Sequence, residues 1–379
     1  MQNFDDIRFY KDEEVQPALM EYSRHPMVKA LLQFTFPEKD FGEIEEILKE
    51  CHSIADFQQK VIYLTVEKVL EKTSEGLTDG GFEKLDPSES YFYISNHRDI
   101  ILDTSLINYT LLNHDLVMTG SAIGDNLVQK PFLMALSKLN RNFLVLRNQS
   151  PREMLKSSMK LSAYIRKLLM EDNRSVWMAQ REGRTKDGND VTQQGVLKMV
   201  GMAKQKDEDI LDYFAKLKIV PVAMSYELDP TDMLKMPEVL AKRMQEEYKK
   251  TANEDFNSIM QGAMGQKGRI EINAGNVLKA EDFDKIREKG LSINDQLKEV
   301  AQLIDRSIYR SYKLWPANYI AHDLLKNEER FRDRYSDKEK RQFERRVSRR
   351  ADVKNPLALN SYLLMYANPV INKMSLNEE

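Results

Sequence analysis

The spacing of apolar residues along the chain changes from helical to strand-like and back again. Between residues 17 and 72, apolar residues recur every three or four positions, as Ile54, Phe57 and Val61 do. This is the spacing of an amphipathic helix that turns one face toward a core. The pattern predicts a helical N-terminal region over residues 1–75.

A second pattern begins after Thr78-Asp79-Gly80-Gly81, which has the composition of a turn. Short apolar runs, rich in aromatic and β-branched residues, then alternate with longer segments of helical period, such as residues 152–171. The predicted strands are Tyr91–Ile94, Leu116–Met118, Phe143–Leu146, Ser175–Met178 and Ile219–Ala223. This alternation predicts an α/β core over residues 76–290, with a mostly parallel central sheet covered by helices.

The helical period returns beyond Pro230 and is interrupted once, by the alternating run Arg269–Asn273, which has the pattern of a further strand. We expect residues 291–379 to form a helical C-terminal region. Two segments of this region differ from the rest. Lys338–Arg350 holds seven basic and two acidic residues, a local charge of 7 − 2 = +5, and Leu357–Met374 is apolar.

Composition narrows the class of protein. Of the 379 residues, 41% are hydrophobic and 31% are charged, which excludes a disordered chain. The net charge of −3 argues against a protein dedicated to nucleic acid, whose surface is usually basic. Cys51 is the only cysteine, so the chain has no internal disulfide and no cysteine-based zinc site. These features indicate a reducing, cytoplasmic location.

No apolar stretch approaches the roughly 18 residues that a membrane-spanning helix requires. The first residues, Met1–Glu14, are acidic, whereas a signal peptide is basic and then apolar. We therefore expect any work on lipids to take place at a membrane surface.

His97 is the histidine best placed for catalysis, because it follows a predicted strand of the sheet directly. A neutral imidazole is a suitable general base near pH 7, and a carboxylate on its second nitrogen fixes the tautomer. Asp99 and Asp103 are both candidate partners. The alternative interpretation is a surface histidine flanked by acids that cap a helix.

Three enzyme classes are excluded by missing motifs. His97-Arg98-Asp99 is shared with the kinase catalytic loop, but that loop requires Asn where Thr104 stands, and no glycine-rich loop accompanies it. The chain also lacks Gly-x-Ser-x-Gly, the elbow of many serine hydrolases, and His-Glu-x-x-His, a zinc-protease motif.

Four stretches, taken in order, resemble a known family. Asn96-His97-Arg98 followed by an Asp is similar to the first motif of the glycerolipid acyltransferases, which acylate glycerol 3-phosphate and lysophosphatidic acid. Three further stretches resemble the family's second, third and fourth motifs: Asn142–Arg147, Trp177–Thr185, and Ile219–Val222 with Tyr226. The resemblance covers about residues 90 to 230 and implies an O-acyltransferase.

The chain departs from the family pattern at two places. Five residues separate His97 from Asp103 where the family usually has four, and Glu182-Gly183-Arg184 is one residue shorter than the usual Glu-Gly-x-Arg. Either the loop before the helix absorbs the extra residue and Asp103 pairs with His97, or Asp99 takes its place. We favour Asp103, because Leu102-Asp103-Thr104 is similar to the family's helix start.

The resemblance also implies roles for these residues. His97 and Asp103 form the catalytic pair, and Arg147 and Arg184 hold the acceptor phosphate. Glu182 orients Arg184 or its loop. The expected substrate-binding set is Asn96, Arg98, Arg147, Glu182, Gly183, Arg184 and Thr185. We expect direct transfer in a ternary complex, with no acyl-enzyme, no metal and no cofactor beyond the co-substrate, acyl-CoA or acyl-carrier protein.

The expected acceptor is a lipid or its precursor, with lysophosphatidic acid ahead of glycerol 3-phosphate, so the enzyme would serve phospholipid synthesis. We expect peripheral association with the inner face of the membrane. Lys338–Arg350, beside the apolar tail with Tyr362 and Tyr366, is the candidate contact. The same basic segment is equally suited to an acyl-carrier protein. Two alternatives stay open: an acyl-thioester hydrolase that uses His97 to activate water, and a non-catalytic lipid-binding protein.

Overall fold

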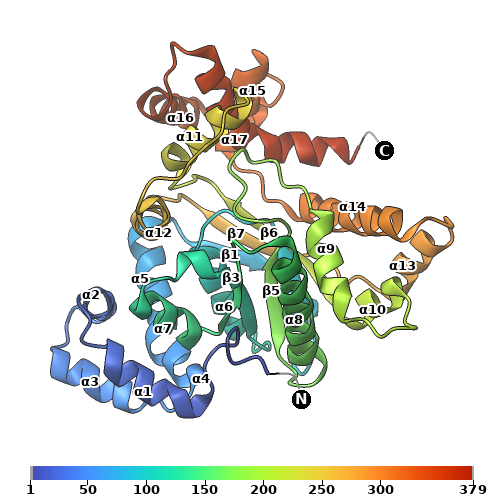
Figure 1. The fold of residues 1–379 in the computed structure, drawn as a ribbon. Helices are drawn as coiled ribbons and strands as arrows, with labels where there is room; N and C mark the ends of the chain where they lie inside the picture. Colours follow the sequence, from blue (N-terminus) through green and yellow to red (C-terminus); the bar gives the residue numbers. More distant parts are fainter. Residues whose placement is uncertain (1–2, 378–379) are drawn as a thin grey trace.

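A seven-stranded sheet forms the centre of the molecule in the computed structural model, which describes residues 3–377 (Figure 1). The strand order is β1-β7-β6-β2-β5-β3-β4. Neighbouring strands are parallel except that β7 runs antiparallel to β6. The strands are β1 (Leu77–Gly80), β2 (Phe92–Ser95), β3 (Thr119–Gly124), β4 (Asn142–Val145), β5 (Ser175–Ala179), β6 (Ile219–Tyr226) and β7 (Ile270–Ala274). The predicted fold class, a mostly parallel sheet covered by helices with helical terminal regions, is confirmed.

Helices cover both faces of the sheet because its strands bury side chains on both sides. In β2, Phe92 and Ile94 belong to one hydrophobic core, whereas Tyr93 belongs to the other. The first face, on the right in Figure 1, is covered by α8 (Pro151–Met170), α9 (Gln194–Val200), α10 (Ile210–Lys216), α13 (Ala280–Arg287) and α14 (Ile293–Ser311). The second is covered by α5 (Tyr63–Thr73) and α6 (Leu102–Asn113).

One predicted strand is absent, and one observed strand lies where a turn was predicted. The apolar run Leu116–Met118 is not a strand, because the left-handed Asp115 (φ 56°) turns the chain after α6 and buries Leu116 first. Strand β3 begins at Thr119, opposite Ser175 of β5. The segment read as a turn also contains β1, which pairs only with β7 at the sheet edge, and the turn itself comes at Gly81 (φ 84°).

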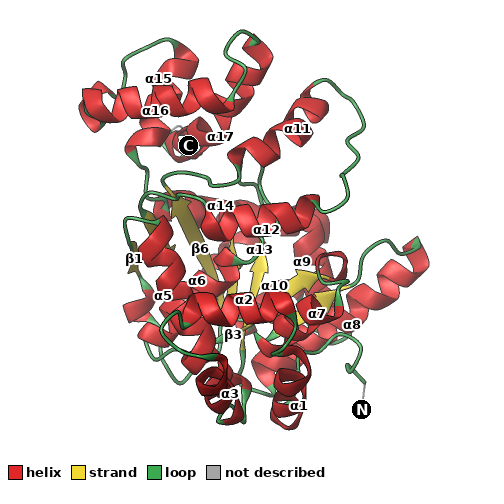
Figure 2. Ribbon diagram, turned by 90° about the vertical axis from the view of Figure 1, so that its left-hand side faces the viewer, coloured by secondary structure: helices red, strands yellow, loops and turns green. Residues whose placement is uncertain are grey.

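Helices before the sheet form a cluster of their own in front of it (Figure 2). It contains α1 (Asp12–Tyr22), α2 (Pro26–Thr35), α3 (Phe41–Lys49) and α4 (Ile54–Phe57), packed against α7 (Pro131–Leu139). A π-helical segment, Gln58–Ile62, joins α4 to α5. Cys51 is buried in this cluster, and burial raises the pKa of its thiol to about 11.

The last helices pack above the carboxyl ends of β2, β5 and β6, at the top of Figure 1. They are α15 (Pro316–Lys326), α16 (Asp337–Arg350) and α17 (Pro356–Ser375), joined by α11 (Asp232–Arg243). A further helix, α12 (Glu254–Met264), precedes β7. Residues 1–2 and 378–379, which end the predicted terminal regions, lie outside the described residues. Within residues 3–377 no helix is both long and apolar enough for a membrane crossing.

Part of the C-terminal segment that we expected to contact the membrane is packed inside the protein. The carboxylate of Asp232 accepts hydrogen bonds from the hydroxyls of Tyr362 and Tyr366 at 2.6 and 2.7 Å. It also pairs with Arg346 and Arg350 of the basic segment at 2.7 and 2.5 Å. The apolar tail is therefore a helix packed against the protein, and Arg346 and Arg350 of the basic segment form ion pairs with a buried aspartate.

Candidate active site

His97 lies in the loop that follows β2, at the carboxyl end of the central strand of the sheet. Its Nδ1 is 2.8 Å from Oδ2 of Asp103, and its ring meets the edge of Trp177 at a centroid distance of 5.4 Å. The histidine side chain is 13% exposed and that of Asp103 is fully buried. With Nδ1 engaged by a carboxylate, Nε2 is the nitrogen that can take up a proton.

Asp103 is fixed by four donors. Besides His97, the backbone N–H groups of Arg98 and Asp99 donate to its Oδ2 at 2.6 and 3.0 Å, and the hydroxyl of Tyr226 donates to Oδ1 at 2.8 Å. Burial alone would raise the pKa of Asp103, but the hydrogen bonds from His97 and the two N–H groups outweigh it and hold that pKa below its usual range. Asp103 is therefore a stable carboxylate that orients the imidazole.

The extra residue between His97 and Asp103 is taken up by a turn at Asp99. Oδ1 of Asp99 accepts the N–H groups of Ile101 and Leu102 at 3.0 and 2.8 Å, which closes the turn at the start of α6. Asp103, in the first turn of that helix, thereby faces back toward His97. The pKa of Asp99 is raised, by burial and by the charge of Asp103. Of the two candidate acids, Asp103 is the one bonded to the histidine.

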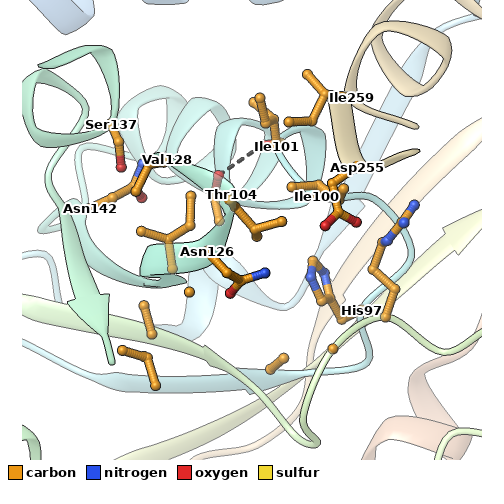
Figure 3. Close-up of a pocket in the computed structure, with 18 of the residues that line it drawn as sticks. His97, Ile100, Ile101, Thr104, Asn126, Val128, Ser137, Asn142, Asp255 and Ile259 are labelled. Atoms are coloured by element: carbon orange, nitrogen blue, oxygen red, sulfur yellow. Dashed lines mark hydrogen bonds between the residues drawn. The ribbon is translucent and has the colours of Figure 1, made fainter. Parts of the chain in front are cut away.

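His97 opens onto a cavity of about 1470 Å³, larger than the roughly 300–1,000 Å³ of most small-molecule sites. Figure 3 shows the imidazole beside Asn126, with Ile100, Ile101 and Ile259 around the same space. Apolar side chains from α2, α5, α7, α8 and α12 line most of the wall. The cavity can therefore enclose a long apolar chain next to a general base.

Basic groups line the polar part of the same cavity. They include Arg147, Arg181, Arg184 and Lys186, and three further lysines lie on the same lining: Lys160, Lys242 and Lys250. Nη1 of Arg184 and Nε of Arg181 are buried and have no hydrogen-bond partner. Because a buried N–H donor without a partner is costly, Arg181 and Arg184 are arranged to receive an anion.

Glu182 was expected to orient Arg184 or its loop, and its partner is a different arginine. Its carboxylate pairs with the guanidinium of Arg147, so two residues of the expected set hold each other across the loops after β4 and β5. The adjoining Gly183 has φ +69°, a conformation that favours glycine, and no neighbour lies within 4 Å of the position a Cβ would take. Gly183 therefore serves the turn that presents Arg184.

Three residues of the expected set lie beneath the cavity and do not line it: Asn96, Arg98 and Thr185. The side chain of Asn96 bonds the backbone N–H and carbonyl of Met224 at 2.8 and 2.9 Å, which ties the His97 loop to β6. Arg98 pairs with Asp190 at 2.5 Å, and the N–H of Thr185 donates to the carbonyl of His97 at 2.9 Å. Their contacts hold the histidine loop in place.

The sequence interpretation assigned no role to three residues of the site: Tyr226, Arg181 and Lys186. Tyr226 was part of the fourth motif, but only the pairing of β6 with β2 places its hydroxyl against Asp103. Burial and the charge of Asp103 raise the pKa of this phenol well above its usual value, so it remains a donor. Arg181 lies within the third motif and Lys186 directly follows it, and their positive charge was the signal that could have indicated them.

Three comparisons with known proteins show what this chain is similar to. Residues 77–225 match the family model described as Acyltransferase, and this range contains His97, Asp103, Arg147 and Arg184. No curated protein matches the chain. Among solved structures, the chain is similar to the 1-acyl-sn-glycerophosphate (LPA) acyltransferase PlsC from Thermotoga maritima at 11% identity, with a TM-score of 0.35 and coverage of 78% of this chain and 93% of that one.

Proposed function

Because residues 77–225 form an acyltransferase domain, we propose that this protein moves a fatty acyl group from a thioester donor to a hydroxyl of a glycerol-phosphate acceptor. One observation carries the proposal. The His97–Asp103 pair, joined at 2.8 Å, opens onto a large apolar cavity whose polar part holds buried nitrogens of Arg181 and Arg184 without hydrogen-bond partners. A base, a chain-sized cavity and an anion site are what this transfer requires.

The proposed reaction proceeds without an acyl-enzyme. Nε2 of His97 removes the proton from the acceptor hydroxyl as its oxygen attacks the thioester carbonyl, while Asp103 stabilises the imidazolium. The tetrahedral intermediate then collapses, the C–S bond breaks, and the leaving thiolate takes the proton from His97. The chain itself supplies each proton transfer, and the products are an ester and a free thiol.

Lysophosphatidic acid is the acceptor that we favour over glycerol 3-phosphate. The cavity is apolar along α2, α5 and α12, and it exceeds the volume that one small polar acceptor would fill. A lysophospholipid would place its phosphate among Arg147, Arg181 and Arg184 and its hydroxyl at His97. The donor, acyl-CoA or acyl-carrier protein, enters the same cavity with its chain.

Arg184→Met tests the phosphate site. The variant should raise the KM for a phosphate-bearing acceptor roughly 10–100-fold, because a charge-assisted hydrogen bond to a buried group is lost. Its KM for monoacylglycerol, which has no phosphate, should change far less. Arg243→Met, an exposed arginine of α11 outside the cavity lining, is the matched control. Equal changes for both acceptors would argue against a phosphate contact.

We propose that the membrane face surrounds the mouth of this cavity. Exposed apolar residues gather there: Met154 (55%), Met260 (43%) and Met264 (49%) line the cavity and are still open to solvent. On α8, Leu155 and Met159 are each 54% exposed. Arg152 and Lys156 are exposed on the same helix, where they would meet anionic headgroups. A lipid acceptor could then pass from the bilayer to His97 without crossing water.

Replacing Leu155 and Met159 together by glutamate should strongly reduce binding to vesicles that contain anionic lipid, because apolar surface is lost and negative charge added. Sedimentation with phosphatidylglycerol vesicles measures this directly. The matched control is Met233→Glu, a 50% exposed methionine of α11 that does not line the cavity. If both variants bind vesicles as well as the wild type does, the membrane face lies elsewhere.

The basic residues of α16 that remain exposed are suited to binding an acyl-carrier protein, the second role considered for this segment. Lys338, Arg341, Arg345 and Arg349 lie on one helix, at intervals of three or four residues. Such a stripe suits an acidic carrier protein. Comparing acyl-CoA with acyl-carrier protein as donor, for wild type and an Arg341→Glu, Arg345→Glu variant, separates donor docking from membrane contact.

The function itself is tested with a panel of acceptors. Thiol release from each donor is measured with lysophosphatidic acid, with glycerol 3-phosphate, with monoacylglycerol and with none. We expect fast release with a phosphate-bearing acceptor, slower release with monoacylglycerol and none without an acceptor. Release without any acceptor would indicate a hydrolase, and lipid binding without release from any pair would indicate a binding protein.

A further inference from the structure

The C-terminal helices hold a cluster of ligating side chains that takes no part in the proposed function. His322 and Asp323, at the end of α15, are each 3% exposed, and Glu328 follows the helix with a side chain that is 41% exposed. The imidazole nitrogen and the carboxylate oxygens of these residues lie within 4.8 Å of one another. None of the three residues lines the cavity of His97.

The buried histidine points into this cluster without a hydrogen bond. Nδ1 of His322 has no hydrogen-bond partner, yet it lies 3.5 Å from Oδ1 of Asp323 and 3.5 Å from Oε1 of Glu328. His97, by contrast, closes to 2.8 Å on its own aspartate. Two carboxylates at an equal distance, both too far for a good hydrogen bond, are arranged around a shared centre.

The spacing agrees with ligands of one tetrahedral ion. Around zinc with ligands at ~2.1 Å, neighbouring ligand atoms of a tetrahedron lie ~3.4 Å apart. We propose that His322, Asp323 and Glu328 bind a zinc ion, with the fourth position open on the exposed side of Glu328. An imidazole beside two carboxylates suits zinc better than calcium or magnesium, which prefer oxygen ligands alone.

The surroundings provide the supporting contacts that such a site needs. Oδ2 of Asp323 accepts the hydroxyl of Tyr335 at 2.9 Å and the N–H of Phe331 at 3.0 Å. Hydrogen bonds of this kind orient a ligating carboxylate. Glu328 follows Asn327, whose left-handed backbone (φ 53°) ends the helix. The ion would thus fasten the end of α15 to the loop that leads to α16.

Zinc titration by calorimetry, on the full chain after chelator treatment and dialysis, tests the proposal. We expect one tight equivalent in the wild type, and an affinity lower by roughly tenfold or more in Glu328→Gln, which is exposed enough to fold normally. Glu329→Gln, the neighbouring exposed acid, is the matched control and should bind as the wild type does. Zinc should raise the Tm of the wild type and of Glu329→Gln more than that of Glu328→Gln.

The absence of a tight equivalent, or equal binding by wild type, Glu328→Gln and His322→Gln, would overturn the proposal. Because the cluster lies outside the cavity, this result is independent of whether the chain transfers acyl groups.

Discussion

Replacing His97 by alanine is expected to lower the rate of acyl transfer by roughly a thousandfold or more, because the variant loses the imidazole that takes the hydroxyl proton. The initial rate of ester formation at saturating donor measures this loss of acyl transfer. The side chain is small and lies at the cavity wall, so the Tm should change little.

The chain offers a close control for this variant. His114 also bonds an aspartate, with Nε2 2.7 Å from Oδ1 of Asp79, but it lies outside the cavity lining. His114→Ala should therefore retain the wild-type rate. A His97→Ala variant with a rate within tenfold of the wild type would show that another group acts as the base.

Asp103→Asn is expected to lower kcat by roughly 10²–10⁴-fold, while Asp99→Asn keeps most of the activity. Oδ2 of Asp103 accepts three N–H donors and Oδ1 a phenol, so an amide in its place leaves some of these donors unmatched and removes the charge that stabilises the imidazolium. Asp99 uses Oδ1 for the turn before α6, and an asparagine retains that acceptor.

The pair of variants decides which acid serves His97. The values of kcat and of KM for the acceptor are compared at several pH values. Loss of the carboxylate that fixes the tautomer of His97 should change kcat, whereas the acceptor site is retained. If Asp99→Asn is the variant that loses activity and Asp103→Asn is not, the hydrogen bond between His97 and Asp103 is structural only.

The sheet was predictable where the pattern is local. The runs at 91–94, 143–146, 175–178 and 219–223 became β2, β4, β5 and β6 because buried parallel strands are continuously apolar. Strand β3 was not predicted, because its sequence, Thr119–Gly124, consists mostly of small residues and has no apolar run. At Gly120 a Cβ would lie 3.2 Å from the ring of Phe9, 111 positions earlier in the chain, so the reason for the glycine is tertiary.

The candidate active site was also predictable only where it depends on local sequence, and not where it depends on tertiary contacts. The sequence indicated His97 and its two candidate acids, but the choice between them depends on how the turn at Asp99 folds. The pairing of Arg147 with Glu182 depends on β4 and β5, which are separated by β3 in the sheet. The cavity was not predictable either, because periodicity shows that α2, α5 and α12 have apolar faces and does not show which faces leave space between them.

The measurement that decides most directly whether this protein is an acyltransferase follows both products at once. Free thiol and new ester are quantified together from one acyl thioester and lysophosphatidic acid, for wild type and His97→Ala. We expect one thiol for each ester in the wild type, neither product without acceptor, and almost none in the variant. Thiol released without ester, or ester formed at the wild-type rate by His97→Ala, would contradict the proposed function.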